Sequence, residues 1–204
     1  MGVSSPDFDA KDIYGTIAES ARIFAAVSQD MALQMSVREA SDLVVSCFKN
    51  GGKLLLCGNG GSAADAQHFA GEMVGSFLIK NRPGLAAVAL NADTSVLTCV
   101  GNDRSYDEVF AQQVSALGRS GDVLLGFSTS GNSANVVRAF EAAGSVGMKC
   151  IAMTGQGGVL PSMADVSVCV PSCSTPRIQE VHALIIHLMC GYIEAEMFCG
   201  EQLG

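Results

Sequence analysis

A repeat of short apolar runs and glycine-rich turns, which begins at residue 53, places the strongest constraint on the fold of this chain. Five of the runs are typical of buried strands, at residues 53–57, 85–90, 123–127, 150–153 and 166–170. Stretches of helical length with helical periodicity lie between most of them. Strands that alternate with helices form a parallel sheet with helices on both faces. The sequence therefore predicts an α/β protein with a three-layer αβα sandwich.

The segment ahead of these strands has a different pattern. Between residues 13 and 49, apolar side chains recur at spacings of three and four, which is typical of amphipathic helices. The pattern predicts two helices with a break near residues 28–30. Asn50, Gly51 and Gly52 then form a signal that stops the second helix.

Length and charge exclude several classes of protein. A chain of 204 residues fits one domain of ordinary size. The formal net charge of −8 argues against nucleic acid or a membrane surface as a partner, because such sites usually carry a basic patch. An anionic substrate would have to be bound by local backbone donors.

The cysteines and the apolar segments indicate a cytoplasmic protein. The eight cysteines are scattered through apolar runs and lack zinc-finger spacing, so we expect reduced thiols. Residues 1–11 contain Asp7 and Asp9 and no apolar core, which argues against a targeting peptide. The most apolar late stretch, residues 183–193, is too short to span a bilayer.

Two loops have the composition of phosphate-binding sites. Residues 58–62, Gly-Asn-Gly-Gly-Ser, leave a strand and enter a helix, and residues 128–133 repeat the arrangement with four hydroxyl side chains. Backbone amides at a helix N-terminus bind anions. Neither the Walker A motif nor the dinucleotide GxGxxG is present, so a phosphate monoester fits better than a nucleotide. Gly, Asn and Ser also serve simply as turns and caps, but two such loops in one sheet favour an anion site.

His68 and Glu72 are candidates for proton transfer or metal binding. They are four residues apart on the helix that follows the first loop, so they share a face. A glutamate beside a histidine can act as a base or as a metal ligand. The alternative is an ordinary surface pair.

A second candidate element covers residues 177–187. Gln179 and His187 lie on roughly one side of the predicted helix, whereas His182 points about 140° away from His187. We expect His187, which sits among Ile185, Ile186 and Leu188, to be buried. A core histidine without a catalytic role remains an alternative, and helix geometry does not choose between His182 and His187.

At these motifs the sequence resembles the phosphoheptose isomerase family, within the sugar isomerase (SIS) domains. The matching segments are residues 58–69, Asn102-Asp103, residues 121–124, residues 128–133 and residues 177–182. The resemblance extends over roughly residues 15–198. It implies a flavodoxin-like five-stranded parallel sheet, an N-terminal helical segment (residues 1–50) used in assembly, and an SIS domain over residues 51–204. It also implies a homotetramer with active sites at subunit interfaces.

The resemblance further implies an activity and a set of site residues. The reaction would convert sedoheptulose 7-phosphate to D-glycero-D-manno-heptose 7-phosphate through an enediol, for surface glycans such as lipopolysaccharide or capsule. Glu72 would be the general base and His187 its acid/base partner. Zinc would be held by His68, Glu72, Gln179 and His187. The residues implied to contact substrate are Asn59, Gly60, Gly61, Glu72, Asn102, Asp103, Ser128, Thr129, Ser130, Ser133 and Gln179.

Two other functions remain open at the level of sequence. One SIS relative is a binding module for a replication initiator and lacks the glutamate and the final histidine, both of which this chain has at Glu72 and His187. Another possibility is an isomerase for a different sugar phosphate, such as a pentose phosphate. Those relatives commonly carry regulatory domains, for which a chain of 204 residues has no room.

Overall fold

The computed structural model describes residues 12–199, and the segments 1–11 and 200–204 lie outside the described residues. Residues 1–11, which the sequence predicts are not a targeting peptide, therefore lie outside the described residues. In chain order the elements are α1 (Ile13–Gln29), α2 (Met31–Lys49), β1 (Leu54–Cys57), α3 (Gly61–Val74), β2 (Ala87–Ala89), α4 (Thr94–Asp103), the 3-10 helix η1 (Tyr106–Glu108), α5 (Ala111–Leu117), β3 (Val123–Ser128), α6 (Ala134–Ser145), β4 (Lys149–Thr154), α7 (Leu160–Met163), β5 (Val166–Cys169) and α8 (Thr175–Phe198).

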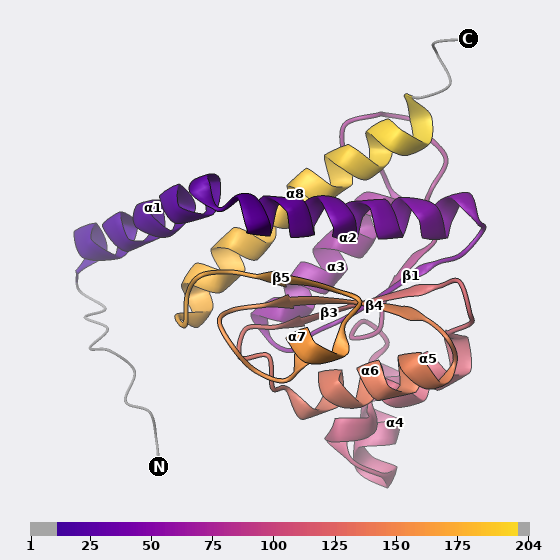
Figure 1. Cartoon of the computed structure of the whole chain (residues 1–204). Coiled ribbons are helices and arrows are strands. Elements are labelled where there is room, and N and C mark those ends of the chain that lie inside the picture. The colour runs from indigo at the N-terminus through magenta and orange to yellow at the C-terminus, as the bar shows by residue number, and fades with distance from the viewer. Residues whose placement is uncertain (1–11, 200–204) are drawn as a thin grey trace.

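The five strands form one parallel sheet in the order β2-β1-β3-β4-β5. This is the flavodoxin-like order, and it confirms the predicted fold. Figure 1 shows α2, α3 and α8 on one face of the sheet, with α4, α5 and α6 on the other. The order reverses between β1 and β3, so the loops after these two strands lie at the point where ligands bind in open α/β sheets.

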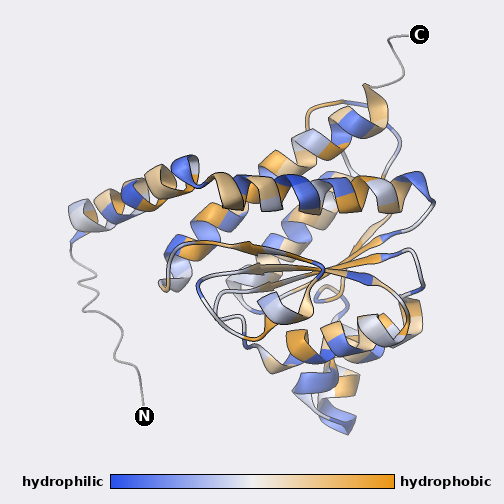
Figure 2. Cartoon of the chain, viewed as in Figure 1, coloured by the Kyte–Doolittle hydropathy of each residue, from blue (hydrophilic) through white to orange (hydrophobic). Residues whose placement is uncertain are grey.

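Each strand supplies side chains to both faces of the sheet. On β1, Leu54 and Leu56 join the core beneath α2, α3 and α8, whereas Leu55 and Cys57 join the core beneath α5 and α6. This alternation follows from the two-residue period of a strand. Both cores are apolar, and Figure 2 shows that the strands are largely hydrophobic along their length. Two-sided burial explains why the strands are continuous apolar runs in the sequence.

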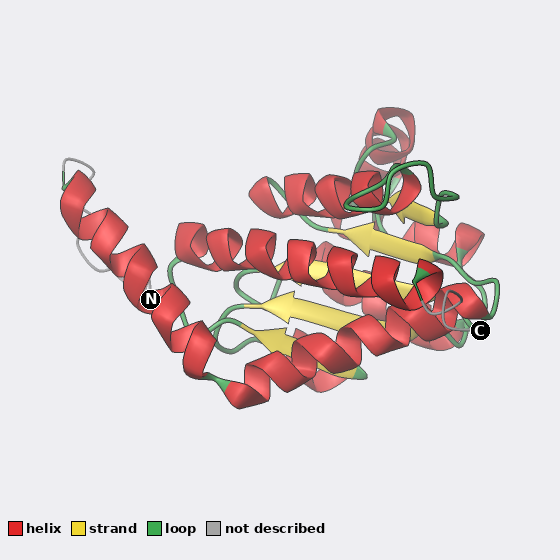
Figure 3. Cartoon of the chain, turned by 90° about the horizontal axis from the view of Figure 1, so that it is seen from above, coloured by secondary structure: helices red, strands yellow, loops and turns green. Residues whose placement is uncertain are grey.

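The helical pair at the N-terminus breaks where the sequence predicts. Asp30 ends α1, and its side chain accepts a hydrogen bond from Leu33 N at 3.0 Å to cap α2. α2 buries Leu33, Val37 and Val44 against the sheet, but Val27 is the one buried residue of α1. Seen from the side and from above, α1 extends away from the body of the molecule (Figures 1 and 3).

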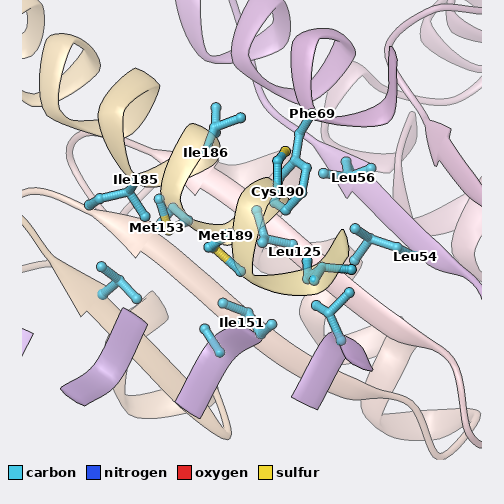
Figure 4. Close-up of a cluster of buried hydrophobic side chains, with 14 of the residues drawn as sticks. Leu54, Leu56, Phe69, Leu125, Ile151, Met153, Ile185, Ile186, Met189 and Cys190 are labelled. Atoms are coloured by element: carbon cyan, nitrogen blue, oxygen red, sulfur yellow. The ribbon is translucent and has the colours of Figure 1, made fainter. Parts of the chain in front are cut away.

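α8 is the main core helix on its face of the sheet. Figure 4 shows Ile185, Ile186, Met189 and Cys190 packed among side chains from β1, β3, β4 and α3. Each fully buried side chain of this size contributes about 1.5–3 kcal/mol. α8 therefore stabilises the whole layer.

The length of α8 corrects one expectation. The helix has 24 residues, and it is the one helix among residues 12–199 that is long and apolar enough to cross a membrane. The apolar stretch read from the sequence, residues 183–193, is only the middle of this helix, which continues beyond it at both ends. In this fold α8 is apolar because one of its faces is buried in the protein core.

Candidate active site

At the carboxyl edge of the sheet, the loop after β1 is joined to the first turn of α6, the helix that follows the loop after β3. Asn59 Nδ2 donates to Asn135 Oδ1 at 2.8 Å, and Asn135 Nδ2 donates back to Asn59 Oδ1 at 2.8 Å. Tyr106 also donates its hydroxyl to Asn59 Oδ1, at 3.4 Å. Asn135 is buried, so this closed pair of bonds fixes the two loops next to each other.

The helices that follow these loops begin without a side-chain cap. Gly60 precedes α3 with a φ of 57°, a left-handed conformation that favours glycine. Ser133 precedes α6, and no side-chain cap bond forms at either helix N-terminus. A Ser side chain that caps a helix would accept a bond from a backbone amide of the first turn. The two adjacent N-termini instead leave positive ends for an anion.

The hydroxyl-rich loop, residues 128–133, is held by contacts between its own side chains and by the loop after β4. Ser128 Oγ lies 2.8 Å from Ser133 Oγ and 3.4 Å from Ser130 Oγ. Gly131 has a φ of 66°, and a Cβ there would lie 2.5 Å from the Gly157 carbonyl oxygen. The loop after β4 therefore supports the loop after β3 through a close backbone contact.

His68, Glu72 and His187 come together between α3 and α8. His68 Nε2 lies 3.3 Å from His187 Nε2 and 3.6 Å from Glu72 Oε1. The His68 and Glu72 side chains are 35% and 27% exposed, so solutes can reach them. The sequence prediction that His187 joins the group on α3 is consistent with this geometry.

Gln179 lies against the first loop. A Cβ on Gly61 would lie 2.6 Å from Gln179 Nε2 and 2.7 Å from its Oε1. The amide therefore packs directly on the start of α3. Thr175, one turn earlier on α8, has its Oγ1 3.3 Å from Thr129 Oγ1, so the N-terminal end of α8 touches both loops.

The expectation that His187 is buried is wrong: His187 is exposed, and His182 is the buried histidine of α8. His187 is exposed, because residues 187 and 188 fall on the outer side of α8 while Ile185, Ile186 and Met189 face the sheet. His182 is fully buried against Phe127, with Nε2 3.4 Å from the Thr154 carbonyl oxygen. Burial lowers the pKa of His182 to about 4, against a smaller opposing effect of the Thr154 carbonyl. His182 is thus a neutral core residue away from the cluster.

Asn102 and Asp103 stand apart from the rest of the predicted substrate set. Both are exposed at the end of α4, where Asn102 Nδ2 donates to Asp103 Oδ1 at 2.8 Å. Within the described chain they form no hydrogen bond to either loop. A substrate or a conformational change would have to connect them to the site.

The donor set is compatible with zinc. Tetrahedral zinc with Zn–N bonds of about 2.0–2.1 Å places two imidazole nitrogens about 3.3–3.4 Å apart, and the His68 and His187 Nε2 atoms are 3.3 Å apart. Over residues 12–199, no three His, Cys, Asp or Glu side chains are gathered closely enough to hold a metal as they stand. The two imidazoles fit the ion, and the resemblance would add Glu72 and Gln179 to the ligand set.

Several residues near the site carry little local signal in the sequence. Asn135 and Tyr106 are recognised only once the two loops are seen together. Glu194 is buried, but Glu196 lies two residues further along the same helix and is exposed, so the sequence does not show which of the two has a buried partner. That partner is Arg82, far away in the sequence.

The fold and this site define a sugar isomerase (SIS) domain. The SIS domain family model matches residues 17–155 of the chain. The phosphoheptose isomerase of Burkholderia pseudomallei (strain K96243) is 49% identical over 191 residues, which are 93% of this chain and 96% of the relative. That of Thiobacillus denitrificans (strain ATCC 25259 / T1) is 54% identical over 175 residues, 84% of this chain and 88% of the relative.

Solved structures agree with these sequence relatives. A phosphoheptose isomerase from Neisseria gonorrhoeae superposes with a TM-score of 0.84 at 50% identity, covering 90% of this chain and 97% of that one. One from Francisella tularensis gives a TM-score of 0.85 at 39% identity, covering 89% and 95%. The chain belongs to the phosphoheptose isomerase family.

Proposed function

We propose that this chain is a ketose–aldose isomerase that converts sedoheptulose 7-phosphate to D-glycero-D-manno-heptose 7-phosphate. The observation that carries the proposal is that His68 lies within 3.6 Å of both Glu72, on α3, and His187, on α8. The two helices α3 and α6 begin without a side-chain cap. Family membership supports the same reaction. The product would enter the synthesis of ADP- or GDP-activated heptose for lipopolysaccharide or capsule.

The phosphate would bind where the two loops meet. Backbone amides of Gly60 and Gly61 and the hydroxyls of Ser128, Ser130 and Ser133 offer donors to a dianion without a nearby lysine. The Asn59–Asn135 pair holds these donors in place before the substrate arrives. Positioning of this kind lowers the entropic part of the barrier.

Glu72 and His187 would carry out the proton transfers. The Glu72 carboxylate removes a proton from C1 of the ketose, and His187 donates a proton to the C2 carbonyl oxygen, which gives a cis-enediol. Glu72 then returns its proton to C2, while His187 takes the hydroxyl proton from O1. The aldehyde forms at C1 and both residues regain their starting states. Groups of this type each contribute about 10²- to 10⁴-fold in rate.

Zinc is proposed as the cofactor, one ion per chain, held by His68, Glu72, Gln179 and His187. When bound, it would polarise the substrate oxygens as a Lewis acid. Glutamine is an uncommon ligand, and its place in the set rests on the resemblance to the family.

We also propose a cytoplasmic homotetramer in which α1 and the start of α2 pack against other copies. Ile13, Tyr14, Ile17, Met31 and Met35 are each more than 60% exposed, although all five are large and apolar. Single exposed apolar residues are ordinary, but a group on one projecting helical pair is typical of an interface.

The deciding experiment is to incubate the purified chain with sedoheptulose 7-phosphate and follow the carbon signals by NMR. Conversion to an aldoheptose 7-phosphate supports the proposal. Ribulose 5-phosphate, tested in parallel, distinguishes a pentose phosphate isomerase from a heptose enzyme. Binding of the heptose phosphate without turnover would instead favour a binding module.

A further inference from the structure

The segment that follows α3 is fastened to α8 by a buried carboxylate. Glu194 accepts hydrogen bonds from three successive backbone amides, those of Phe77, Leu78 and Ile79, at 2.7–2.9 Å. It also accepts from Arg82 Nε at 2.5 Å. Burial would raise the pKa of Glu194, but the Arg82 bond and the three amides outweigh it and lower the pKa to about 2. The carboxylate is therefore charged and fully paired.

Arg82 extends this anchor to the end of α3. Its guanidinium donates to the carbonyl oxygens of Glu72, at 2.6 Å, and Met73, at 2.8 Å. Arginine that binds the last carbonyls of a helix fixes that helix end. The Arg82 and Glu194 side chains are each 1% exposed. One buried pair thus holds α8, the loop and the backbone of the proposed general base.

The anchored loop places an aromatic ring on His187. The Phe77 and His187 rings lie almost parallel, 8° apart, with their centroids separated by 5.5 Å. Glu194 comes seven residues after His187, so the two occupy the same side of α8, two turns apart. Gly191 lies between them, and a Cβ there would lie 3.6 Å from Phe77 Cε1. The ring therefore lies along the surface of α8.

His187 is then confined between two rings. His68 packs edge-on against it with a centroid distance of 4.9 Å and an interplanar angle of 78°. His187 is otherwise exposed, and an exposed imidazole can occupy several staggered rotamers. Phe77 and His68 restrict that rotation and direct Nε2 toward α3.

We infer that Phe77 is a positioning residue for isomerisation, held by the Glu194–Arg82 anchor so that its ring fixes the orientation of His187. The inference rests on the proposed function for its kinetic consequence, but the ring contact itself has an independent readout. Phe77 touches His187 and is not assigned any contact with substrate. It acts on the step that His187 performs, and an effect on the turnover number rather than on substrate binding is expected.

The test compares Phe77→Leu with Phe48→Leu, the same change at a buried site on α2 in the same core. Phe77→Leu keeps an apolar side chain but removes the flat ring, and we expect kcat to fall about 10-fold to 100-fold with KM changed by less than about 2-fold. Phe77→Tyr keeps the ring and should restore kcat. Phe48→Leu should keep both constants even if it lowers the melting temperature.

A spectroscopic measurement separates this role from simple packing. The chain has 3 histidines, so its imidazole carbon-bound protons give few NMR signals, which His68→Gln and His187→Gln assign. Loss of the Phe77 ring current should shift the His187 signals in Phe77→Leu and leave them in place in Phe48→Leu. An active wild type, together with wild-type kcat and unshifted His187 signals in Phe77→Leu, would overturn the inference. An inactive wild type whose His187 signals still shift would count against the proposed function alone.

Discussion

Asn59 and Asn135, 76 residues apart in the sequence, exchange two side-chain hydrogen bonds of 2.8 Å and thereby tie the first predicted phosphate loop to the first turn of α6, directly after the second loop. Each loop alone is an ordinary turn with a helix behind it. Joined, they set two helix N-termini side by side at the reversal of strand order. The proposed phosphate site is therefore held together by contacts within the protein.

Loss of either proton-transfer group should abolish most of the activity. We expect Glu72→Gln and His187→Gln each to lower kcat by about 10²- to 10⁴-fold, because each removes one acid/base group without removing much volume. Glu196→Gln, an exposed change on α8, is the control and should keep wild-type activity. The measurement is turnover of sedoheptulose 7-phosphate, with circular dichroism to verify folding. Wild-type turnover in either variant would remove that residue from the mechanism.

Displacing Gln179 should affect activity more than stability. In Gly61→Ala the new methyl group would lie 2.6 Å from Gln179 Nε2, and the flexible amide can move away. We expect kcat/KM to fall about 10-fold or more, with unfolding free energy changed by less than about 1 kcal/mol. Gly71→Ala on the same helix meets no atom within 4 Å and should leave activity unchanged. It should also stabilise α3 by about 0.5–1 kcal/mol. Equal activity of the two variants would contradict a role for Gln179.

The buried neutral His182 should make the protein less stable in mild acid. Its pKa is lowered to about 4 in the folded state, from an ordinary value of 6.5, so the unfolded chain binds more protons between these values. The stability linked to His182 is complete above pH 6.5 and is lost as the pH falls toward 4, by up to about 3 kcal/mol.

Urea unfolding between pH 7.5 and 4.5 measures this loss. His182→Asn should unfold more easily at pH 7.5 but show a flatter pH dependence than the wild type. Asp65 acts in the opposite direction, because burial raises its pKa to about 6, so its contribution falls as the pH rises through 6. The comparison of slopes between wild type and variant cancels that contribution. Parallel slopes would show that His182 titrates normally.

The Arg82–Glu194 anchor should contribute strongly to folding. Glu194→Ala leaves Arg82 and three backbone amides without their acceptor in a buried position, and we expect a loss of about 3–5 kcal/mol. Glu196→Ala, two residues further along α8, removes an exposed partner of Lys49 and should cost less than about 1 kcal/mol. Denaturant midpoints of the two variants give the difference directly. A similar cost for both would mean that water replaces the lost acceptor.

Metal content provides a test of the proposed zinc site. Protein purified without chelators should contain about one zinc ion per chain by elemental analysis. His68→Gln and His187→Gln should lower this content, whereas His182→Asn should not, because His182 is in the core. Zinc-free protein whose activity is unchanged by a chelator would leave Glu72 and His187 as the acid/base pair and remove the metal from the proposal.

The layers of the fold could be predicted from sequence because strands that are buried on both faces of a parallel sheet are continuous apolar runs. The five apolar runs correspond to the five strands, and the break between the first two helices falls at Asp30, which caps the second helix. Both signals are local, since they depend on neighbours within a few residues.

The parts of the site that depend on distant contacts could not be predicted in the same way. The neighbours of His187 suggested burial, but a rotation of 100° per residue puts it on the outer side of α8. Glu194 and Arg82 are 112 residues apart, and neither sequence neighbourhood identifies the other. The contact between Phe77 and His187 depends on that pairing, so it could not be predicted from the sequence either.

The position of α8 in the chain has a consequence for biosynthesis. α8 follows every strand and contributes Gln179 and His187, whereas His68 and Glu72 belong to α3, which is translated much earlier. A nascent chain that has not yet released α8 from the ribosome holds one half of the proposed catalytic cluster, and one face of its sheet lacks the main core helix. We therefore expect that a prematurely terminated product without α8 loses much of that core and is inactive.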